Sequence, residues 1–281
     1  MKRYVLLLTL MVVCASALIV FISDYQALVK KSKGRRGFAG EAAERSIEDI
    51  VEAVGPSVVA INTRERRLVR PRGGDPLLRY FGDDSDLLAE SEGIGSGVIF
   101  DPDGYVLTNG HVVGRAQEIQ VTLADGRRVE ATLCAIDQER DLALIKLAEG
   151  GLHAAEFGDS ENLRVGQWVI AFGNPFGTAS RNAQPSVTSG VISALQRNLK
   201  VGQGRIYRDL IQTDAAINSG NNGGPLVDLS GRVIGLSTLI LTSSGASTGL
   251  GFAIPVDVIK ERLDELKRQC LRRRGVKGAT R

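Results

Sequence analysis

Three separated segments of this chain carry side chains whose types and order suit acyl-transfer chemistry. His111 lies in LTNGHVV, at the expected end of a strand, where a rigid scaffold can hold a general base. Asp141 opens the apolar run DLALIKL, so its carboxylate is placed to reach the imidazole and fix its tautomer. The third segment, DAAINSGNNGGPL from Asp214 to Leu226, contains glycines that permit a tight loop. Such a loop can aim successive N–H groups at a developing oxyanion.

Each segment has an ordinary structural explanation when it is taken alone. A lone histidine beside valines is more often structural, and a lone aspartate before a strand is usually a turn residue. Asn-Asn-Gly-Gly is by itself a good turn. The three together, in the order base, acid and glycine-rich loop, indicate a protease-like site.

The three segments resemble the signature of the HtrA/Deg family of trypsin-like serine proteases, with Asn222 in place of the nucleophilic serine. The membrane-anchored layout described below resembles that of the DegS branch of the family. Four further segments are also similar to it: Gly95–Phe100, Ala171–Gly177, Thr188–Ser193 and Gly249–Pro255. The likeness runs from about Ser46 to Leu271. It implies catalytic positions at His111, Asp141 and Asn222, and an oxyanion hole at Gly220, Asn221 and Asn222. No cofactor is expected, and no metal, because the two histidines, His111 and His153, have no ligand spacing.

The sequence departs from the family in three places. Asn222 replaces the serine, Ser219 stands where the family usually has proline, and the chain ends soon after Pro255, so no PDZ domain is expected. A carboxamide nitrogen is delocalised into its carbonyl and cannot serve as the nucleophile that His111 would activate. Loss of the nucleophile from such a triad removes on the order of a millionfold in rate. Ser219 is no substitute, because it lies three residues away on the wrong side of the loop.

The sequence therefore predicts a proteolytically inactive homologue that retains binding of unfolded or extended polypeptide. Two alternatives remain open: an active serine endopeptidase of periplasmic protein quality control or regulated proteolysis, and a structural subunit assembled with a paralogue. The resemblance implies a trimer. Retention of His111 and Asp141 favours recent loss or an engineered change over long drift.

The N-terminus predicts a membrane element. Tyr4–Ile22 carries no charge, and the length of this uncharged run is at the threshold for a spanning helix. A cleaved signal peptide is the rival interpretation, with a cleavage-like site at Ala15–Ala17. The apolar run continues past that site through Leu18–Ile22, which favours an uncleaved anchor.

Charge and resemblance disagree on membrane orientation. Five cations follow the span, at Lys30, Lys31, Lys33, Arg35 and Arg36, and the positive-inside rule alone would place the following domain in the cytoplasm. The resemblance implies a bacterial inner-membrane protein with its soluble domain in the periplasm, and this interpretation is preferred.

The remaining pattern predicts an all-β fold of two antiparallel six-stranded barrels, with an N-terminal transmembrane helix and a C-terminal helix. Twelve short strands are expected: 57–63, 97–100, 105–108, 118–123, 128–136, 142–147, 168–172, 187–194, 210–213, 226–228, 233–237 and 251–254. The predicted domains are an anchor or signal peptide at 1–23, a tether at 24–45, a trypsin-like protease domain at 46–255, and a helix with a disordered basic tail at 256–281. A short helix is expected over Ser46–Val54.

Charge, aromatic content and cysteine number argue against several classes of function. The net charge of +3 and the 5% aromatic content give little reason to expect nucleic-acid binding. Three scattered cysteines predict neither a disulfide framework nor a metal site. Cys134 is expected to be a buried apolar residue. Cys270 could form an intermolecular bridge, but a solvent-side thiol is preferred. Arg64–Glu92 is predicted to be a functional or disordered insertion. Within it Asp75–Gly82 is either a solvated loop or, as the resemblance implies, a contact between subunits.

Overall fold

The computed structural model describes residues 46–69, 87–175, 183–201, 205–240 and 249–278. These residues fall in one compact unit, Arg45–Arg281. The predicted contact segment Asp75–Gly82 and the apolar run Tyr4–Ile22 lie outside the described residues. Within the part that is described, no helix is both long and apolar enough to cross a membrane.

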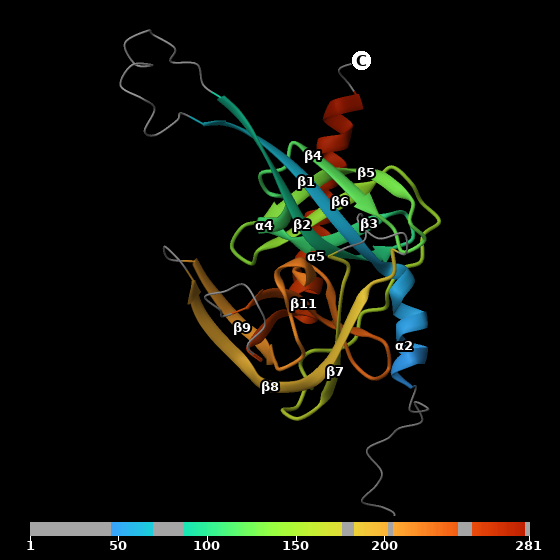
Figure 1. Ribbon diagram of the computed structural model, residues 1–281, viewed down its shortest axis with the longest axis vertical. Helices are drawn as coiled ribbons and strands as arrows, with labels where there is room; N and C mark the ends of the chain where they lie inside the picture. Colours follow the sequence, from blue (N-terminus) through green and yellow to red (C-terminus); the bar gives the residue numbers. More distant parts are fainter. Residues whose placement is uncertain (1–45, 70–86, 176–182, 202–204, 241–248, 279–281) are drawn as a thin grey trace, which may run out of the picture. The chain divides into compact units, whose positions relative to one another are not determined.

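In the described ranges, twelve strands form two closed antiparallel barrels. Figure 1 shows how the two barrels are arranged. The first has the strand order β1-β2-β3-β6-β5-β4 and the second β10-β11-β12-β9-β8-β7. The strands of the first barrel are β1 (Val58–Val69), β2 (Leu87–Asp101), β3 (Tyr105–Asn109), β4 (Glu118–Thr122), β5 (Arg128–Asp137) and β6 (Leu142–Leu147). Those of the second are β7 (Trp168–Gly173), β8 (Ser186–Val201), β9 (Arg205–Thr213), β10 (Pro225–Val227), β11 (Val233–Ile240) and β12 (Gly251–Pro255). The predicted all-β fold and all twelve expected strands are confirmed.

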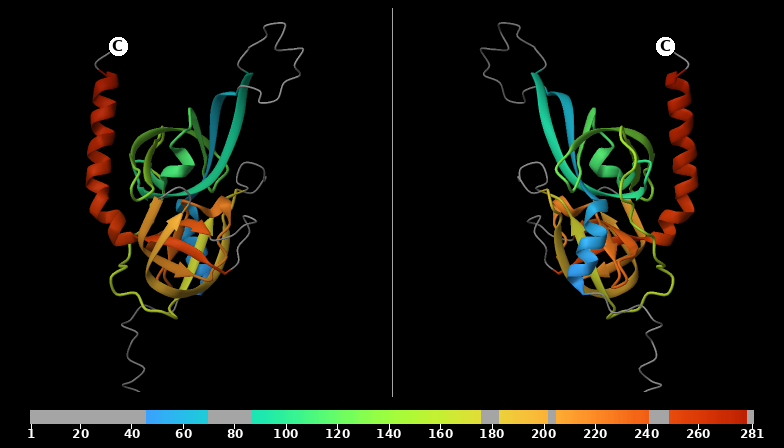
Figure 2. Two further views of the ribbon diagram at one scale, coloured as in Figure 1. Left: turned by 90° about the vertical axis from the view of Figure 1, so that its left-hand side faces the viewer. Right: turned by 90° about the vertical axis from the view of Figure 1, so that its right-hand side faces the viewer.

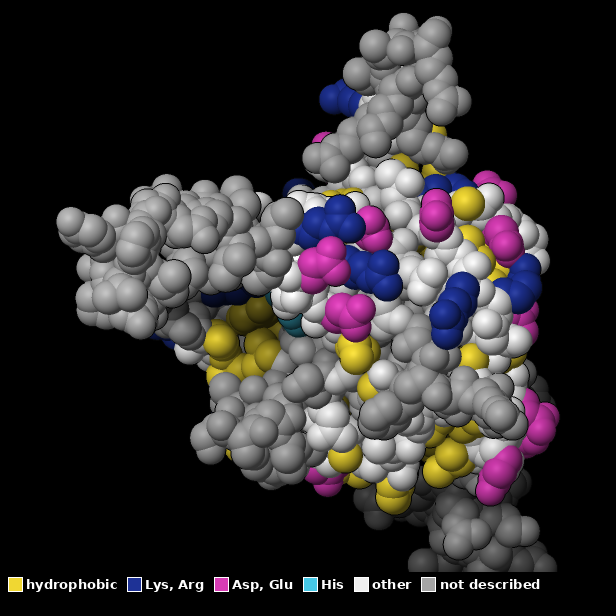
Figure 3. Space-filling model, turned by 45° about the horizontal axis from the view of Figure 1, so that its top comes forward, with side chains coloured by type: hydrophobic (Ala, Val, Ile, Leu, Met, Phe, Trp, Pro, Cys, Tyr) yellow, Lys and Arg dark blue, Asp and Glu magenta, His cyan; other side chains and the backbone are white. Residues whose placement is uncertain are grey.

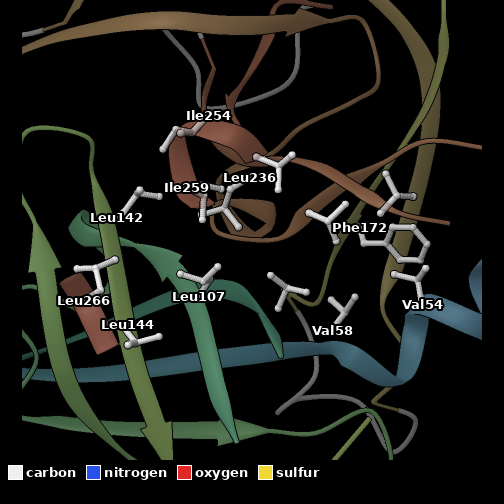
Figure 4. Packing of buried hydrophobic residues seen from close by; sticks show 14 of the residues in the cluster. Val54, Val58, Leu107, Leu142, Leu144, Phe172, Leu236, Ile254, Ile259 and Leu266 are labelled. Atoms are coloured by element: carbon white, nitrogen blue, oxygen red, sulfur yellow. The ribbon is translucent and has the colours of Figure 1, made fainter. Parts of the chain in front are cut away.

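Strand β6 is apolar on both faces because each face meets a different core. On β6, Ala143, Ile145 and Leu147 point into the first barrel. Leu142 and Leu144 belong instead to a cluster that lies between the barrels and also includes Phe172 (Figure 4). A third cluster fills the second barrel. Burial on both faces explains why DLALIKL reads as a nearly continuous apolar run.

A short helix, α2 (Ile47–Val54), precedes the first strand as predicted. Ser46 caps it: its side chain accepts a hydrogen bond from the Asp49 N–H, and the Asp49 carboxylate accepts one from the Ser46 N–H. This reciprocal pair satisfies two otherwise unpaired helix donors. Ile50 and Val54 are buried, so the helix is held by its apolar face as well as by its cap.

The prediction that Arg64–Glu92 is a functional or disordered insertion is wrong at both ends of that range, which form strands. β1 and β2 pair from Val58↔Val98 out to Val69↔Leu87, so both ends of that stretch belong to one long hairpin. The charged residues are compatible with strand structure because they form cross-strand ion pairs, Arg64–Glu92 at 3.7 Å and Arg66–Glu90 at 2.9 Å.

The C-terminal helix α5 (Val256–Gly278) follows β12 and lies along the side of the first barrel (Figure 2). Its buried residues Val256, Ile259, Leu266 and Cys270 match the predicted face. The predicted disordered tail from Leu271 is wrong over most of its length, because the helix continues to Gly278.

A disulfide joins Cys134 of β5 to Cys270 of α5. The expectation of a solvent-side thiol at Cys270 is therefore wrong. Cys134 is buried as expected, but its sulfur is bonded to Cys270. Both side chains are buried. Ion pairs from Arg262 to Asp137 (2.9 Å) and from Lys267 to Asp101 (2.7 Å) fasten the same helix to the first barrel.

We expect removal of the disulfide to lower stability. The bridge closes a loop of 136 residues, and loss of a long-loop disulfide costs about 2–5 kcal/mol. Urea unfolding should show that loss in the Cys134→Ser/Cys270→Ser double variant, and in the unmodified chain after reduction. Reduction should not affect the double variant further. Equal unfolding midpoints for oxidised and reduced unmodified chain would contradict this prediction.

Asp257, in the first turn of α5, predicts a pH dependence. Burial raises the pKa of its carboxyl, but hydrogen bonds from Lys260 and Ser160 outweigh burial and bring the pKa down to about 2. A lowered folded-state pKa gives stability that is present above the unfolded value near 4 and is lost as pH falls towards 2. Asp257→Asn should therefore cost about 1–2 kcal/mol at pH 7 and progressively less below pH 4. The exposed Asp264→Asn is the matched control in urea titrations across pH, and a cost independent of pH would exclude this assignment.

Candidate active site

The structure brings His111, Asp141 and Asn222 together, although they come from three separate segments. His111 Nδ1 lies 2.6 Å from Asp141 Oδ2, and Asn222 Nδ2 lies 3.3 Å from His111 Nε2. With the Nδ1 proton directed at the carboxylate, Nε2 of the neutral ring is the acceptor for the Asn222 amide. The three side chains thus form one hydrogen-bonded line.

His111 is positioned by a short helix, not by a continuing strand. β3 ends at Asn109, and α4 (Gly110–Val113) carries the imidazole, whose side chain is 38% exposed. Asp141 also holds the backbone of this turn. The Gly110 N–H donates to the Asp141 carbonyl, and the His111 N–H donates to Asp141 Oδ1 at 2.9 Å. The acid therefore orients both the ring and the backbone of the base.

Asp141 is fully buried and has a backbone φ of 58°, which is uncommon for a residue other than glycine. Its carboxylate accepts hydrogen bonds from three residues beyond His111: Arg205 at 3.1 Å, Tyr207 at 3.0 Å and Thr238 at 3.3 Å. Burial raises the pKa of Asp141, but the bonds and charges of His111, Tyr207 and Arg205 outweigh burial and leave the pKa below its usual value. The carboxylate is therefore held in its charged form.

Arg205, Tyr207 and Thr238 were not predicted from the sequence as site residues. They lie on β9 and β11 of the second barrel, whereas Asp141 precedes β6 of the first. The guanidinium of Arg205 also lies over the Tyr207 ring, 5.8 Å from its centroid. No local pattern marks these residues, since only the docking of the two barrels brings them to the carboxylate.

The loop that contains Asn222 is anchored by Ser96 of β2. The Ser96 hydroxyl donates to the Gly220 carbonyl at 2.7 Å, and its N–H donates to the Asn222 carbonyl at 2.8 Å. The same hydroxyl accepts from the Asn174 N–H at 2.7 Å. One buried serine thus holds the loop to the first barrel.

The two glycines after Asn222 are required by close packing. Gly223 has a φ of +84°, and a Cβ there would lie 2.3 Å from the Ser96 carbonyl oxygen. A Cβ on Gly224 would lie 2.1 Å from the Phe172 carbonyl oxygen. These contacts show why NNGGP forms this loop and admits no larger residues at the two positions.

The predicted oxyanion loop contains a short 3-10 turn, η2 (Ser219–Asn221). The Asn221 N–H donates to the Asn218 carbonyl at 2.8 Å and is therefore engaged within the turn. The N–H groups of Gly220 and Asn222 are the two remaining candidates for binding a carbonyl oxygen.

A cavity of about 670 Å³ opens beside the imidazole. It is lined from the first barrel, α4 and the start of β9, and its lining includes His111, Arg115 and Arg205. Figure 3 shows a face of the molecule on which cationic and acidic side chains are interspersed. Among the described residues, no three His, Cys, Asp or Glu side chains are grouped to hold a metal ion.

Comparison with known proteins places this site in a family. A family model described as "Trypsin-like peptidase domain" matches residues 95–236. Relatives named "Probable periplasmic serine endoprotease DegP-like" include one from Rickettsia conorii, 40% identical over 85% of this chain and 49% of its own length. Another, from Halomonas elongata, is 42% identical over 78% of this chain and 48% of its own. The chain therefore spans about half the length of these relatives.

Solved structures agree with the family match. A variant of the HtrA-type protease AlgW, with a decapeptide, superposes with a TM-score of 0.71 at 39% identity, covering 80% of this chain and 67% of its own. AlgW itself with a decapeptide gives 0.64 at 40% identity, covering 80% of this chain and 68% of its own. This chain belongs to the trypsin-like peptidase family. Within that family it is a member of the HtrA/DegP-like group.

We expect Ser96→Ala to destabilise the protein by about 1–3 kcal/mol, because it leaves the partly buried Gly220 carbonyl and the buried Asn174 N–H without their shared partner. Ser91→Ala on the exposed part of the same strand is the matched control and should change little. Urea unfolding measures both variants. Equal effects of the two substitutions would show that the Ser96 bonds do not hold the loop.

Proposed function

We propose that this protein is a proteolytically inactive HtrA/DegP-like homologue that binds extended or unfolded polypeptide through its retained cleft. The observation that carries the proposal is Asn222, whose carboxamide lies 3.3 Å from His111 Nε2. That is the position from which a serine hydroxyl would be activated. The base His111 and its orienting acid Asp141 are present, but the carboxamide of Asn222 at the nucleophile position cannot attack a carbonyl carbon.

The expected kinetic effect is large. Loss of the nucleophile from a complete triad lowers the rate by about a millionfold, which corresponds to about 8 kcal/mol of activation free energy. An oxyanion loop and binding groups alone retain about a thousandfold over water. The cleft therefore keeps groups that can bind polypeptide, while the rate of cleavage falls below the detection limit of ordinary assays.

The same proposal includes a location and an assembly. The apolar run Tyr4–Ile22 supports a single-pass anchor in a bacterial inner membrane, and the periplasmic names of the relatives support a periplasmic domain. Assembly as a homotrimer, or with an active paralogue, belongs to this proposal as well. A purely structural subunit would share that assembly but would show no polypeptide binding.

The rival function is an active serine endopeptidase, and the names of the relatives favour it. The two candidates differ in a single assay. The unmodified chain and its Asn222→Ser variant are tested with an unfolded protein substrate and a serine-directed fluorophosphonate. Asn222→Ser/His111→Ala serves as the control for the base.

We expect no labelling or cleavage by the unmodified chain, labelling and cleavage by Asn222→Ser, and loss of both in the double variant. Cleavage by the unmodified chain that disappears on His111→Ala would overturn the inactive assignment. An inert Asn222→Ser variant would show that more than the nucleophile has been lost.

A further inference from the structure

The cavity beside His111 has an uneven arrangement of charged groups. Five ionisable side chains line it: Glu65, His111, Arg115, Asp141 and Arg205. Asp141 is fully buried, and His111, Arg205, Tyr207 and Thr238 already donate to its carboxylate. Its negative charge is therefore compensated by the protein and not available to a ligand.

The two arginines keep hydrogen-bonding capacity that the described part of the protein does not use. Within that part Arg205 donates through Nη1, to Asp141 and Tyr207, and 40% of its side chain is exposed. Among the described residues no acceptor is found for its Nε and Nη2 groups. Arg115 is exposed and has no ion pair with any described residue. A guanidinium carries five donors in a planar fork that matches a carboxylate.

Glu65 is the one acidic group of the lining whose side chain is partly exposed. It opposes an anionic ligand with one charge, against the two positive charges of the arginines. The remaining polar lining, which includes Thr63, Ser91 and Gln138, carries no charge. The balance of accessible charge in the cavity is therefore positive.

We propose that this cavity is a subsite for a carboxylate group of the bound polypeptide, recognised by Arg115 together with the unused edge of Arg205. The inference rests on the proposed binding function and names the ligand that the cleft selects. Two sources supply this chemistry: an Asp or Glu side chain, or the free C-terminus of a peptide that ends in the cleft. Both present the same planar pair of oxygens to the arginines.

Peptide binding separates these possibilities. The full chain is titrated by fluorescence anisotropy with labelled, unstructured decapeptides in which Asp or its neutral isostere Asn occupies each position in turn. Each peptide is prepared with an amidated and with a free C-terminus. We expect at least one Asp position, or the free C-terminus, to tighten binding about threefold or more at low salt. The advantage should shrink as ionic strength rises, because exposed charge pairs are screened.

Protein variants assign the effect to the cavity. Arg115→Gln should remove the preference for the carboxylate peptide while leaving affinity for the neutral peptide unchanged. Arg208→Gln, on β9 but lining a different cavity, is the matched control and should retain the preference. Arg115→Lys keeps the charge without the planar fork and should retain part of it.

Each outcome is decisive. Equal binding of Asp and Asn peptides, amidated or free, would overturn the carboxylate subsite and leave polypeptide binding standing. A preference that survives Arg115→Gln would place recognition elsewhere. Absence of binding by every peptide would overturn the proposed function and this inference with it. Because the comparison of Asp with Asn is made on the unmodified chain, it holds even where a variant fails to fold.

Discussion

The buried carboxylate of Asp141 is the interaction on which the site depends. A charge removed from water is tolerated only where hydrogen bonds and opposite charge replace its hydration. Here the replacement comes from both barrels: His111 from the first, and Arg205, Tyr207 and Thr238 from the second. The site therefore exists only while the two barrels are docked, and the same carboxylate contributes to holding them in register.

The docking is provided by an apolar cluster between the barrels and by the helix that spans them. Leu107, Leu142 and Leu144 from the first barrel meet Phe172, Leu236 and Ile254 from the second, and α5 adds Ile259 and Leu266 to the same cluster. The Cys134–Cys270 bridge and two ion pairs then fix α5 to the first barrel, while Asp257 and Ser160 fix its beginning near the second. Non-directional burial brings the barrels together, and the polar contacts determine their register.

The sequence predicts those features that are encoded locally. The strands follow from apolar runs between turn residues, and the helix at Ile47–Val54 from its apolar period. His111, Asp141 and the Asn222 loop are recognisable because short motifs contain them. Arg205, Tyr207 and Cys270 could not be identified, since their roles arise from contacts with residues 64 to 136 positions away. The outer part of the β1–β2 hairpin was missed for a related reason, because its charges are compatible with a strand only when its partner strand is known.

The hydrogen bonds of the Asn222 side chain are only partly satisfied by its surroundings. Its Nδ2 group contacts His111, but its Oδ1 atom is buried and has no hydrogen-bond partner among the described residues. A buried acceptor left unpaired costs about 1–3 kcal/mol, so the carboxamide is not stabilising at this position. Around it, Ser96, Gly223 and Gly224 hold a loop whose close contacts do not involve the carboxamide. The loop is therefore held by contacts that do not depend on the side chain at position 222.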